Sequence, residues 1–230
     1  MRAALLLLAG TLTLNAAEVR VFAAASLTES LEEIAAAYER ETKDDVVFNF
    51  GASSMLARQV DAGAPADLLL SADELARTTR LSERVAFLGN QLVIVTRDAR
   101  IRHPRDLAGK KLALAEPSTV PAGIYARTYL QKLGLWERVK AHVIPTDNVR
   151  GALAAVVAGN VDAAIVYRTD ARIAKGVRVA YAVPQSEGPR IAYLFAMVQD
   201  AQPHARRFFA YLQTRRAKDV FKKHGFDVLR

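Results

Sequence analysis

The stretch 21-VFAAASLTES-30 passes from an apolar strand to a helix through three alanines and a serine. Its first two residues suit a buried strand, and apolar residues recur at helical spacing over residues 29–41. Ser26 and Glu29 stand three residues apart, which is the spacing of a capping box. The junction therefore predicts a strand followed at once by a capped helix, with small side chains where the two meet.

Three other predicted strands pass directly into helix starts: 48-FNFGASSMLARQ-59, 119-TVPAGIYARTYL-130 and 145-PTDNVRGALAAVVAG-159. Pro121 suits a first helical turn, Gly123 permits close backbone approach, and Asp147 and Asn148 are candidate caps. Unpaired N–H groups and the positive end of the helix dipole favour negative charge. Several such starts around one cleft predict an anion site. For a serine such as Ser53 taken alone, the alternative is a simple helix cap.

Strand-like and helix-like segments alternate along the chain, which indicates an α/β fold with parallel sheets covered on both faces. The predicted strands are 19–22, 45–50, 67–70, 91–96, 111–115, 143–145, 162–167, 177–183 and 191–198. The predicted helices are 29–41, 55–62, 73–80, 124–133, 151–158, 169–175, 204–213 and 217–224.

The strands at 91–96 and 191–198 do not fit the simple alternation. We interpret them as crossovers between two α/β lobes, with the ligand cleft between the lobes. The predicted lobes are 18–90 with 195–230, and 91–194.

The first 17 residues have the order of a secretory signal peptide. A basic start, Met1-Arg2, precedes an apolar run over residues 3–14, and small residues follow. A membrane anchor is the alternative, but the run is shorter than the ~20 residues that a spanning helix needs. We expect cleavage after Ala17 and a periplasmic mature chain. The chain has no cysteine, which excludes a disulfide framework and a lipid-modified N-terminus.

The formal net charge of the chain is +8. Either a small anion is attracted, or the surface is simply basic and solvated. Nucleic acid is not expected as a partner, because the chain is predicted to be exported and its basic residues are mixed with acids instead of forming a stripe with aromatics.

Sequence motifs for catalysis, metal binding or nucleotide binding are absent. The four histidines do not pair with acids at metal-ligand spacing, and the chain has no G-x-S-x-G, GxxxxGK[ST] or GxGxxG. We therefore predict no catalytic residue, no bare metal cation and no cofactor. Tyr167 ends the predicted strand 162-DAAIVY-167, where its hydroxyl would reach the cleft rim; the alternative is a half-buried aromatic residue at a strand end.

Several segments together resemble the periplasmic molybdate-binding proteins of ABC transporters: VFAAASLTESLEEIAAAYE, GASSMLARQVDAGAPADLLLSAD, VPAGIYARTYLQKLGLW and DNVRGALAAVVAGNVDAAIVYRTDA. The resemblance covers nearly all of the mature chain. It implies the type II two-lobed fold of periplasmic binding proteins. It also implies a monomer that binds molybdate or tungstate and delivers it to an inner-membrane permease.

The resemblance further implies a set of ligand-binding residues. Ser26 and Ser53 would donate hydroxyls, Ala122 and Val149 backbone N–H groups, and Tyr167 its phenol. Selectivity against sulfate and phosphate would come from the size of a shell of fixed neutral donors, and protonated phosphate would lack an acceptor unless Asp147 supplied one. Two alternatives stay open: a binding protein for another oxyanion such as sulfate, and an enzyme on the same two-lobed fold.

Overall fold

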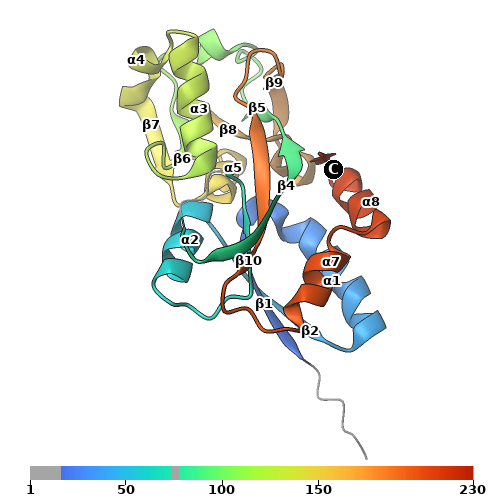
Figure 1. Ribbon diagram of the computed structural model, residues 1–230. Coiled ribbons are helices and arrows are strands. Elements are labelled where there is room, and N and C mark those ends of the chain that lie inside the picture. The colour runs from blue at the N-terminus through green and yellow to red at the C-terminus, as the bar shows by residue number, and fades with distance from the viewer. Residues whose placement is uncertain (1–16, 74–77, 230) are drawn as a thin grey trace, which may run out of the picture.

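The computed structural model describes residues 17–73 and 78–229, which form two α/β lobes, one above the other in Figure 1. Within these residues the first lobe contains a six-stranded sheet of order β11-β4-β10-β3-β1-β2. The second contains a five-stranded sheet of order β7-β6-β8-β5-β9. The two-lobed fold predicted from the sequence is therefore confirmed.

The first lobe combines the N-terminal third of the chain with its C-terminal end. Its strands are β1 (Glu18–Ala24), β2 (Asp45–Gly51), β3 (Leu68–Ser71), β4 (Leu81–Asn90), β10 (Ile191–Val198) and β11 (Asp227–Val228). Its helices are η1 (Ala25–Leu27), α1 (Thr28–Thr42), α2 (Ser53–Asp61), α7 (Ala205–Tyr211) and α8 (Arg215–Lys223). β10 is buried along its whole length, so it forms the centre of this lobe.

The second lobe is continuous in sequence. Its strands are β5 (Leu92–Thr96), β6 (Leu112–Ala115), β7 (Val143–Thr146), β8 (Ala163–Tyr167) and β9 (Arg178–Ala182). Its helices are η2 (Pro104–Leu107), α3 (Pro121–Lys132), α4 (Trp136–Val139), η3 (Lys140–His142), α5 (Val149–Val157) and α6 (Arg168–Ile173). β5, β6 and β8 are fully buried, as expected for strands covered on both faces.

The sheets are mixed, which corrects the expectation of parallel sheets. β1 pairs in parallel with β2 and β3, and β6 with β7 and β8. β10 runs antiparallel to β3 and β4, and β5 antiparallel to β8 and β9. The antiparallel pairs involve the strands next to the two crossings, where the chain enters a sheet without a βαβ connection.

The chain crosses between lobes twice. It leaves the first sheet at the end of β4 and enters the second at β5, with only Gln91 between them. It returns through residues 183–190 to β10. The predicted boundary at 194/195 falls inside β10, whose residues 191–194 pair with β4 in the first sheet.

Two differences from the predicted elements concern the segment before the first crossing. β4 was not predicted, because residues 82–84 are three exposed polar residues in succession and hide the alternation of a strand. Residues 74–77 of the predicted helix 73–80 lie outside the described residues, and residues 73 and 78–80 are not helical. In the described part of the chain, no helix is both long and apolar enough to span a membrane.

Candidate functional site: a neutral cavity between the lobes

Strand ends and helix starts from both lobes converge on a small cavity. The volume of this cavity is about 20 Å³. The lining residues are small or uncharged: Ala24, Ala25, Ser26, Gly51, Ala52, Ser53, Ala72, Val120, Pro121, Ala122, Asn148, Val149 and Tyr167. The first seven come from the first lobe and the rest from the second, so the site exists only where the lobes meet.

The structure brings all five predicted binding residues to this cavity. Ser26 lies in η1, Ser53 begins α2, Ala122 is the second residue of α3, Val149 begins α5 and Tyr167 ends β8. Their positions in five different elements explain why no local motif joins them. Two neighbours lie elsewhere. Ser54 lines only a larger outer groove, and Asp147 is exposed and is not among the lining residues.

The helix starts of the second lobe have the local features that the sequence predicted. Asn148 caps α5, and its side-chain oxygen accepts from the N–H groups of Arg150 at 2.9 Å and Gly151 at 3.2 Å. The N–H of Val149 is not one of these donors. Pro121 occupies the first position of α3. Gly123 is required there, because a Cβ would overlap the carbonyl oxygen of Ala115.

The serines do not cap their helices, so the predicted capping box of Ser26 and Glu29 is wrong. Helix α1 starts only at Thr28, with no side-chain cap. The hydroxyl of Ser26 instead lies 2.8 Å from the hydroxyl of Tyr193 in β10. The Ser53 hydroxyl accepts a 2.9 Å hydrogen bond from the Ala72 N–H, and α2 likewise has no side-chain cap. Both hydroxyls therefore make tertiary hydrogen bonds instead of capping their helices.

Tyr167 has a buried hydroxyl with no hydrogen-bond partner among the described residues. The residue is 1% exposed and lines the cavity. Burial raises the pKa of Tyr167 well above its ordinary value, so the phenol keeps its proton. An unpaired buried hydroxyl costs free energy unless a ligand completes it. Tyr167 is therefore a donor that lacks an acceptor.

An ion-paired cluster beside the cavity joins the lobes. Arg150 of α5 donates to both carboxylate oxygens of Glu29 in α1, at 2.7 and 2.6 Å. Its Nε lies 2.7 Å from the buried Asp170 of α6. Burial would by itself raise the pKa of Glu29, but the hydrogen bonds and charge of Arg150 outweigh it and lower that pKa. Burial raises the pKa of Asp170 to about 6 against the opposing effect of Arg150.

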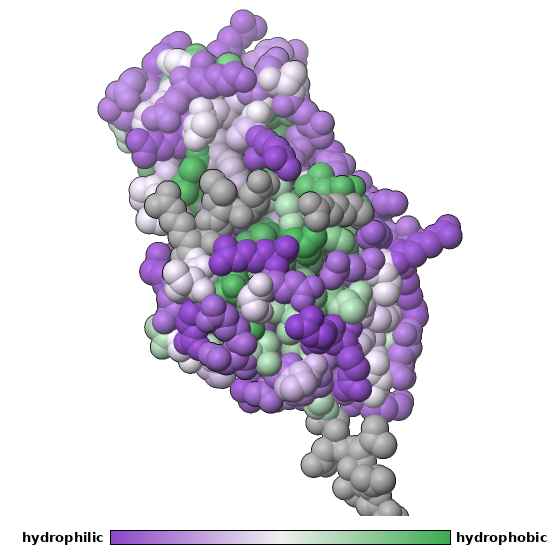
Figure 2. Space-filling view, viewed as in Figure 1, coloured by the Kyte–Doolittle hydropathy of each residue, from purple (hydrophilic) through white to green (hydrophobic). Residues whose placement is uncertain are grey.

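A larger groove of about 780 Å³ adjoins the cavity, and Ser53 and Pro121 line both. Arg58 and Arg190 also line this outer groove. Figure 2 shows a mainly hydrophilic face on the upper lobe, with most of the visible hydrophobic residues at the waist and on the lower lobe. Anions that approach the cavity through the groove would thus pass two arginines.

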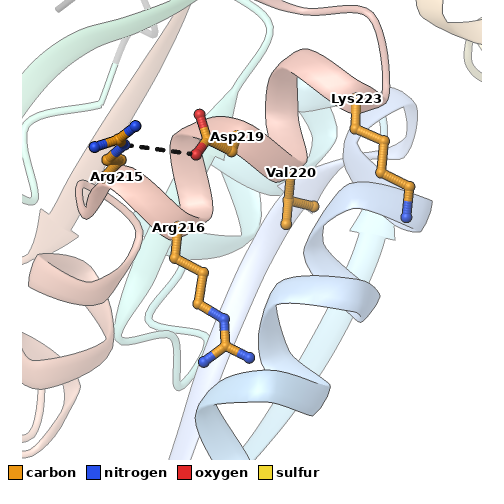
Figure 3. Close-up of a pocket in the computed structure, with 5 residues that line it drawn as sticks. All are labelled: Arg215, Arg216, Asp219, Val220 and Lys223. Atoms are coloured by element: carbon orange, nitrogen blue, oxygen red, sulfur yellow. Dashed lines mark ion pairs between the residues drawn. The ribbon is translucent and has the colours of Figure 1, made fainter.

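Another hollow, on α8, is wide and basic but is not a comparable site (Figure 3). Its cations already have acidic partners. Arg215 pairs with Asp219 at 4.0 Å, Arg216 pairs with Glu41, and Lys223 lies 2.7 Å from Glu33. Within the described residues, no group of three or more acidic or histidine side chains could hold a metal ion.

Comparison with known proteins agrees with this geometry. Residues 19–227 match the family described as bacterial extracellular solute-binding protein. The chain belongs to this family. The molybdate-binding protein ModA of Escherichia coli (strain K12) is 37% identical over 238 residues, which cover 96% of this chain and 93% of that protein. The family resemblance seen in the sequence is thereby confirmed.

Solved structures of two other binding proteins share the fold. The periplasmic molybdate-binding protein of Azotobacter vinelandii has a TM-score of 0.83 at 20% identity, covering 92% of this chain and 100% of that chain. The sulfate-binding protein SubI from Mycobacterium tuberculosis H37Rv has a TM-score of 0.80 at 20% identity, covering 93% and 87%. At this identity the likeness establishes the two-lobed fold and not the ligand.

Sequence reasoning missed the residues that support the binding groups. Tyr193, Asn90 and Thr169 form a buried hydrogen-bonded group behind Ser26. The available signal was weak, since Tyr193 is one polar group within the apolar run of β10 and Asn90 stands at the end of β4. The partners of Ser26 and Arg150 are 167 and 121 residues away in sequence.

Proposed function

We propose that the protein binds one tetrahedral oxyanion, molybdate or tungstate, between its lobes and delivers it to the permease of an ABC transporter. The observation that carries this proposal is the buried hydroxyl of Tyr167, which has no hydrogen-bond partner in the described part of the chain. Tyr167 lines the cavity together with Ser26 and Ser53, and each of these residues can contribute an O–H donor. A fully deprotonated oxyanion supplies only acceptors, which is what such a set of groups needs.

The size of the cavity supports a ligand of this kind. The cavity volume of about 20 Å³ suits a ligand of only a few atoms. This is the scale of a single tetrahedral oxyanion. A shell of fixed donors that fits molybdate would leave a smaller oxyanion with stretched or missing hydrogen bonds, each costing roughly 1–3 kcal/mol.

The charge of the ligand would be balanced without a salt bridge. No charged side chain is among the described residues that line the cavity. The starts of α2, α3 and α5 meet there, and the N-termini of helices stabilise anions through free N–H groups and their dipoles. The N–H groups of Ala122 and Val149 are the donors that we assign to the second lobe.

Binding without chemistry is the role that this site favours. Its described lining contains no histidine, carboxylate or lysine that could act as a general base for Ser26 or Ser53. We also propose that residues 1–17 form a signal peptide that directs the chain to the periplasm, where it acts as a monomer without a cofactor or nucleic acid. The first described strand begins at Glu18, so cleavage after Ala17 would remove no residue of β1; of the described contacts it would remove the 2.9 Å hydrogen bond from the Asp45 N–H to the Ala17 carbonyl oxygen.

A sulfate-binding role is the second candidate, because SubI, named as a sulfate-binding protein, shares the fold with a TM-score of 0.80. The test is a fluorescence titration of the purified protein, using Trp136 and the tyrosines as reporters, with molybdate, tungstate, sulfate and phosphate in the presence of a chelator. We expect saturation with molybdate and tungstate at far lower concentrations than with sulfate or phosphate. Tighter binding of sulfate would favour the second candidate, and loss of binding in chelator would contradict a metal-free site.

A further inference from the structure

A buried chain of hydrogen bonds leads from the junction of the lobes to Ser26. The Asn90 side-chain nitrogen contacts the Tyr193 hydroxyl at 3.2 Å and Thr169 Oγ1 at 3.0 Å. The Tyr193 hydroxyl in turn lies 2.8 Å from Ser26 Oγ. All four residues are at most 6% exposed, and Asn90 is the last residue of β4, where the chain crosses to the second lobe.

The direction of these hydrogen bonds follows from one backbone group. The Gln91 N–H can only donate, and it contacts Asn90 Oδ1 at 2.9 Å, so the opposite atom of that amide must be the NH₂. The NH₂ can only donate, so the oxygen of Tyr193 accepts from it. The single phenol proton then points to its remaining partner, Ser26 Oγ. Burial raises the pKa of Tyr193, so this proton stays in place.

We propose that Tyr193, oriented by Asn90, is a positioning residue that makes Ser26 a donor toward the bound oxyanion and thereby selects against protonated oxyanions. This inference rests on the proposed function. Because Ser26 Oγ accepts from Tyr193, its own proton is directed elsewhere, and the cavity is the space that it lines. A hydroxyl held in this way presents a proton to the ligand instead of a lone pair.

Ser53 is also oriented as a donor toward the cavity, in this case by a backbone N–H group. The Ala72 N–H can only donate, so Ser53 Oγ accepts from it and keeps its own proton for the cavity. The proton of Tyr167 has no other acceptor among the described residues. An oxyanion that carries a proton would therefore bury that proton against donors, and the unmade hydrogen bond would weaken its binding.

A double-mutant cycle with Tyr193→Phe and Ser26→Ala tests the inference, with molybdate affinity measured by calorimetry. Tyr193→Phe removes only the hydroxyl and leaves Ser26 free to rotate. We expect about fivefold or greater weakening in the wild-type background, because a ligand bond loses its orientation. In the Ser26→Ala background, we expect the same substitution to change affinity by less than about twofold, since no hydroxyl remains to be oriented.

Tyr38→Phe is the matched control. Tyr38 is 1% exposed and donates to Asp44 at 2.7 Å, so it also loses one buried hydrogen bond, but it does not line the cavity. We expect it to lower the melting temperature and leave affinity unchanged. An equal loss from Tyr193→Phe in both backgrounds, or no loss in the wild-type background, would show that Tyr193 is only structural and would overturn the inference.

Selectivity gives a second readout that does not depend on the Ser26→Ala background. At mildly alkaline pH, sulfate and hydrogen phosphate carry the same charge, have similar size and differ by one proton. We expect Tyr193→Phe to narrow the preference for sulfate over hydrogen phosphate, measured by competition with molybdate, because Ser26 can then accept the phosphate proton. A ratio of sulfate affinity to hydrogen phosphate affinity that is the same in Tyr193→Phe and in the wild type would contradict the inference. If the wild-type protein binds no oxyanion, the proposed function itself fails, and this inference fails with it.

Discussion

Single hydroxyl groups carry most of the proposed recognition, and their neighbours determine what each can do. Ser53 begins α2 yet makes no cap, because the Ala72 N–H occupies its oxygen. Tyr167 is buried without a hydrogen-bond partner among residues 17–73 and 78–229, although a phenol normally finds one when buried. At this scale the Tyr167 hydroxyl is a donor that a bound oxyanion would satisfy.

Ser53→Ala should weaken molybdate or tungstate binding at least about tenfold, because a hydrogen bond to a charged ligand is worth roughly 1.5–3 kcal/mol. Ser30→Ala is the matched control. Ser30 is 1% exposed and also on a helix of the first lobe, but its hydroxyl donates to the Leu27 carbonyl oxygen and is not among the lining groups. Calorimetric titration of both variants, together with their thermal melts, separates a role in ligand binding from a role in stability. Wild-type affinity in Ser53→Ala would place the ligand elsewhere.

Tyr167→Phe should have opposite effects on binding and on stability. Removing an unpaired buried hydroxyl should leave the free energy of unfolding of the ligand-free protein unchanged or raise it, since no hydrogen bond is lost. Affinity for the oxyanion should fall about tenfold or more. Urea unfolding without ligand and calorimetry with ligand measure the two quantities. A less stable variant with unchanged affinity would mean that the hydroxyl has an internal role.

Helix starts and the contacts between lobes organise the site at the scale of elements. Asn148 caps α5, Gly123 lets α3 approach β6, and Pro121 begins α3. These features follow from local sequence and could be predicted. The ion pair of Arg150 with Glu29 joins α5 to α1 and depends on the lobes being together. The sequence pattern predicts Glu29 only as part of a cap on α1, because a local pattern does not reveal a partner in the other lobe.

Glu29→Gln should weaken oxyanion binding about two- to fivefold, since a partly exposed ion pair is worth up to ~1 kcal/mol and this one favours the closed arrangement. Glu33→Gln provides the comparison on the same helix. Glu33 pairs with Lys223 and His224, both within the first lobe, so its loss should leave affinity unchanged. Equal effects of the two variants on calorimetric affinity would show that the ion pair between the lobes does not assist binding.

The division into two lobes was accessible from sequence, and much of the tertiary detail was not. Strand-helix alternation and two irregular strands indicated the lobes. The antiparallel pairing of β10 and the existence of β4 did not follow, because both depend on the path of the chain through the crossings. Tyr193 and Asn90 were missed for a related reason. Both residues act through hydrogen bonds to distant segments of the chain, and a single polar residue in an apolar strand does not predict such contacts.

At the scale of the whole molecule, export and the fold should be compatible. The described fold begins with β1 at Glu18, directly after the predicted signal peptide. We expect the exported protein to start at or near Glu18 and to occur in the periplasmic fraction, as N-terminal sequencing after cell fractionation would show. A chain that retains Met1 in the cytoplasmic fraction would be inconsistent with this proposal.

The whole molecule is basic, with a formal charge of +8, yet the proposed site is neutral. The most direct test of that claim is the anomalous difference map of a crystal grown with tungstate and without sulfate or phosphate. We expect one strong tungsten peak between the lobes, with its oxygens within hydrogen-bond distance of Ser26, Ser53 and Tyr167. A dominant peak beside arginines such as Arg58 in the outer groove, with none in the cavity, would contradict the account.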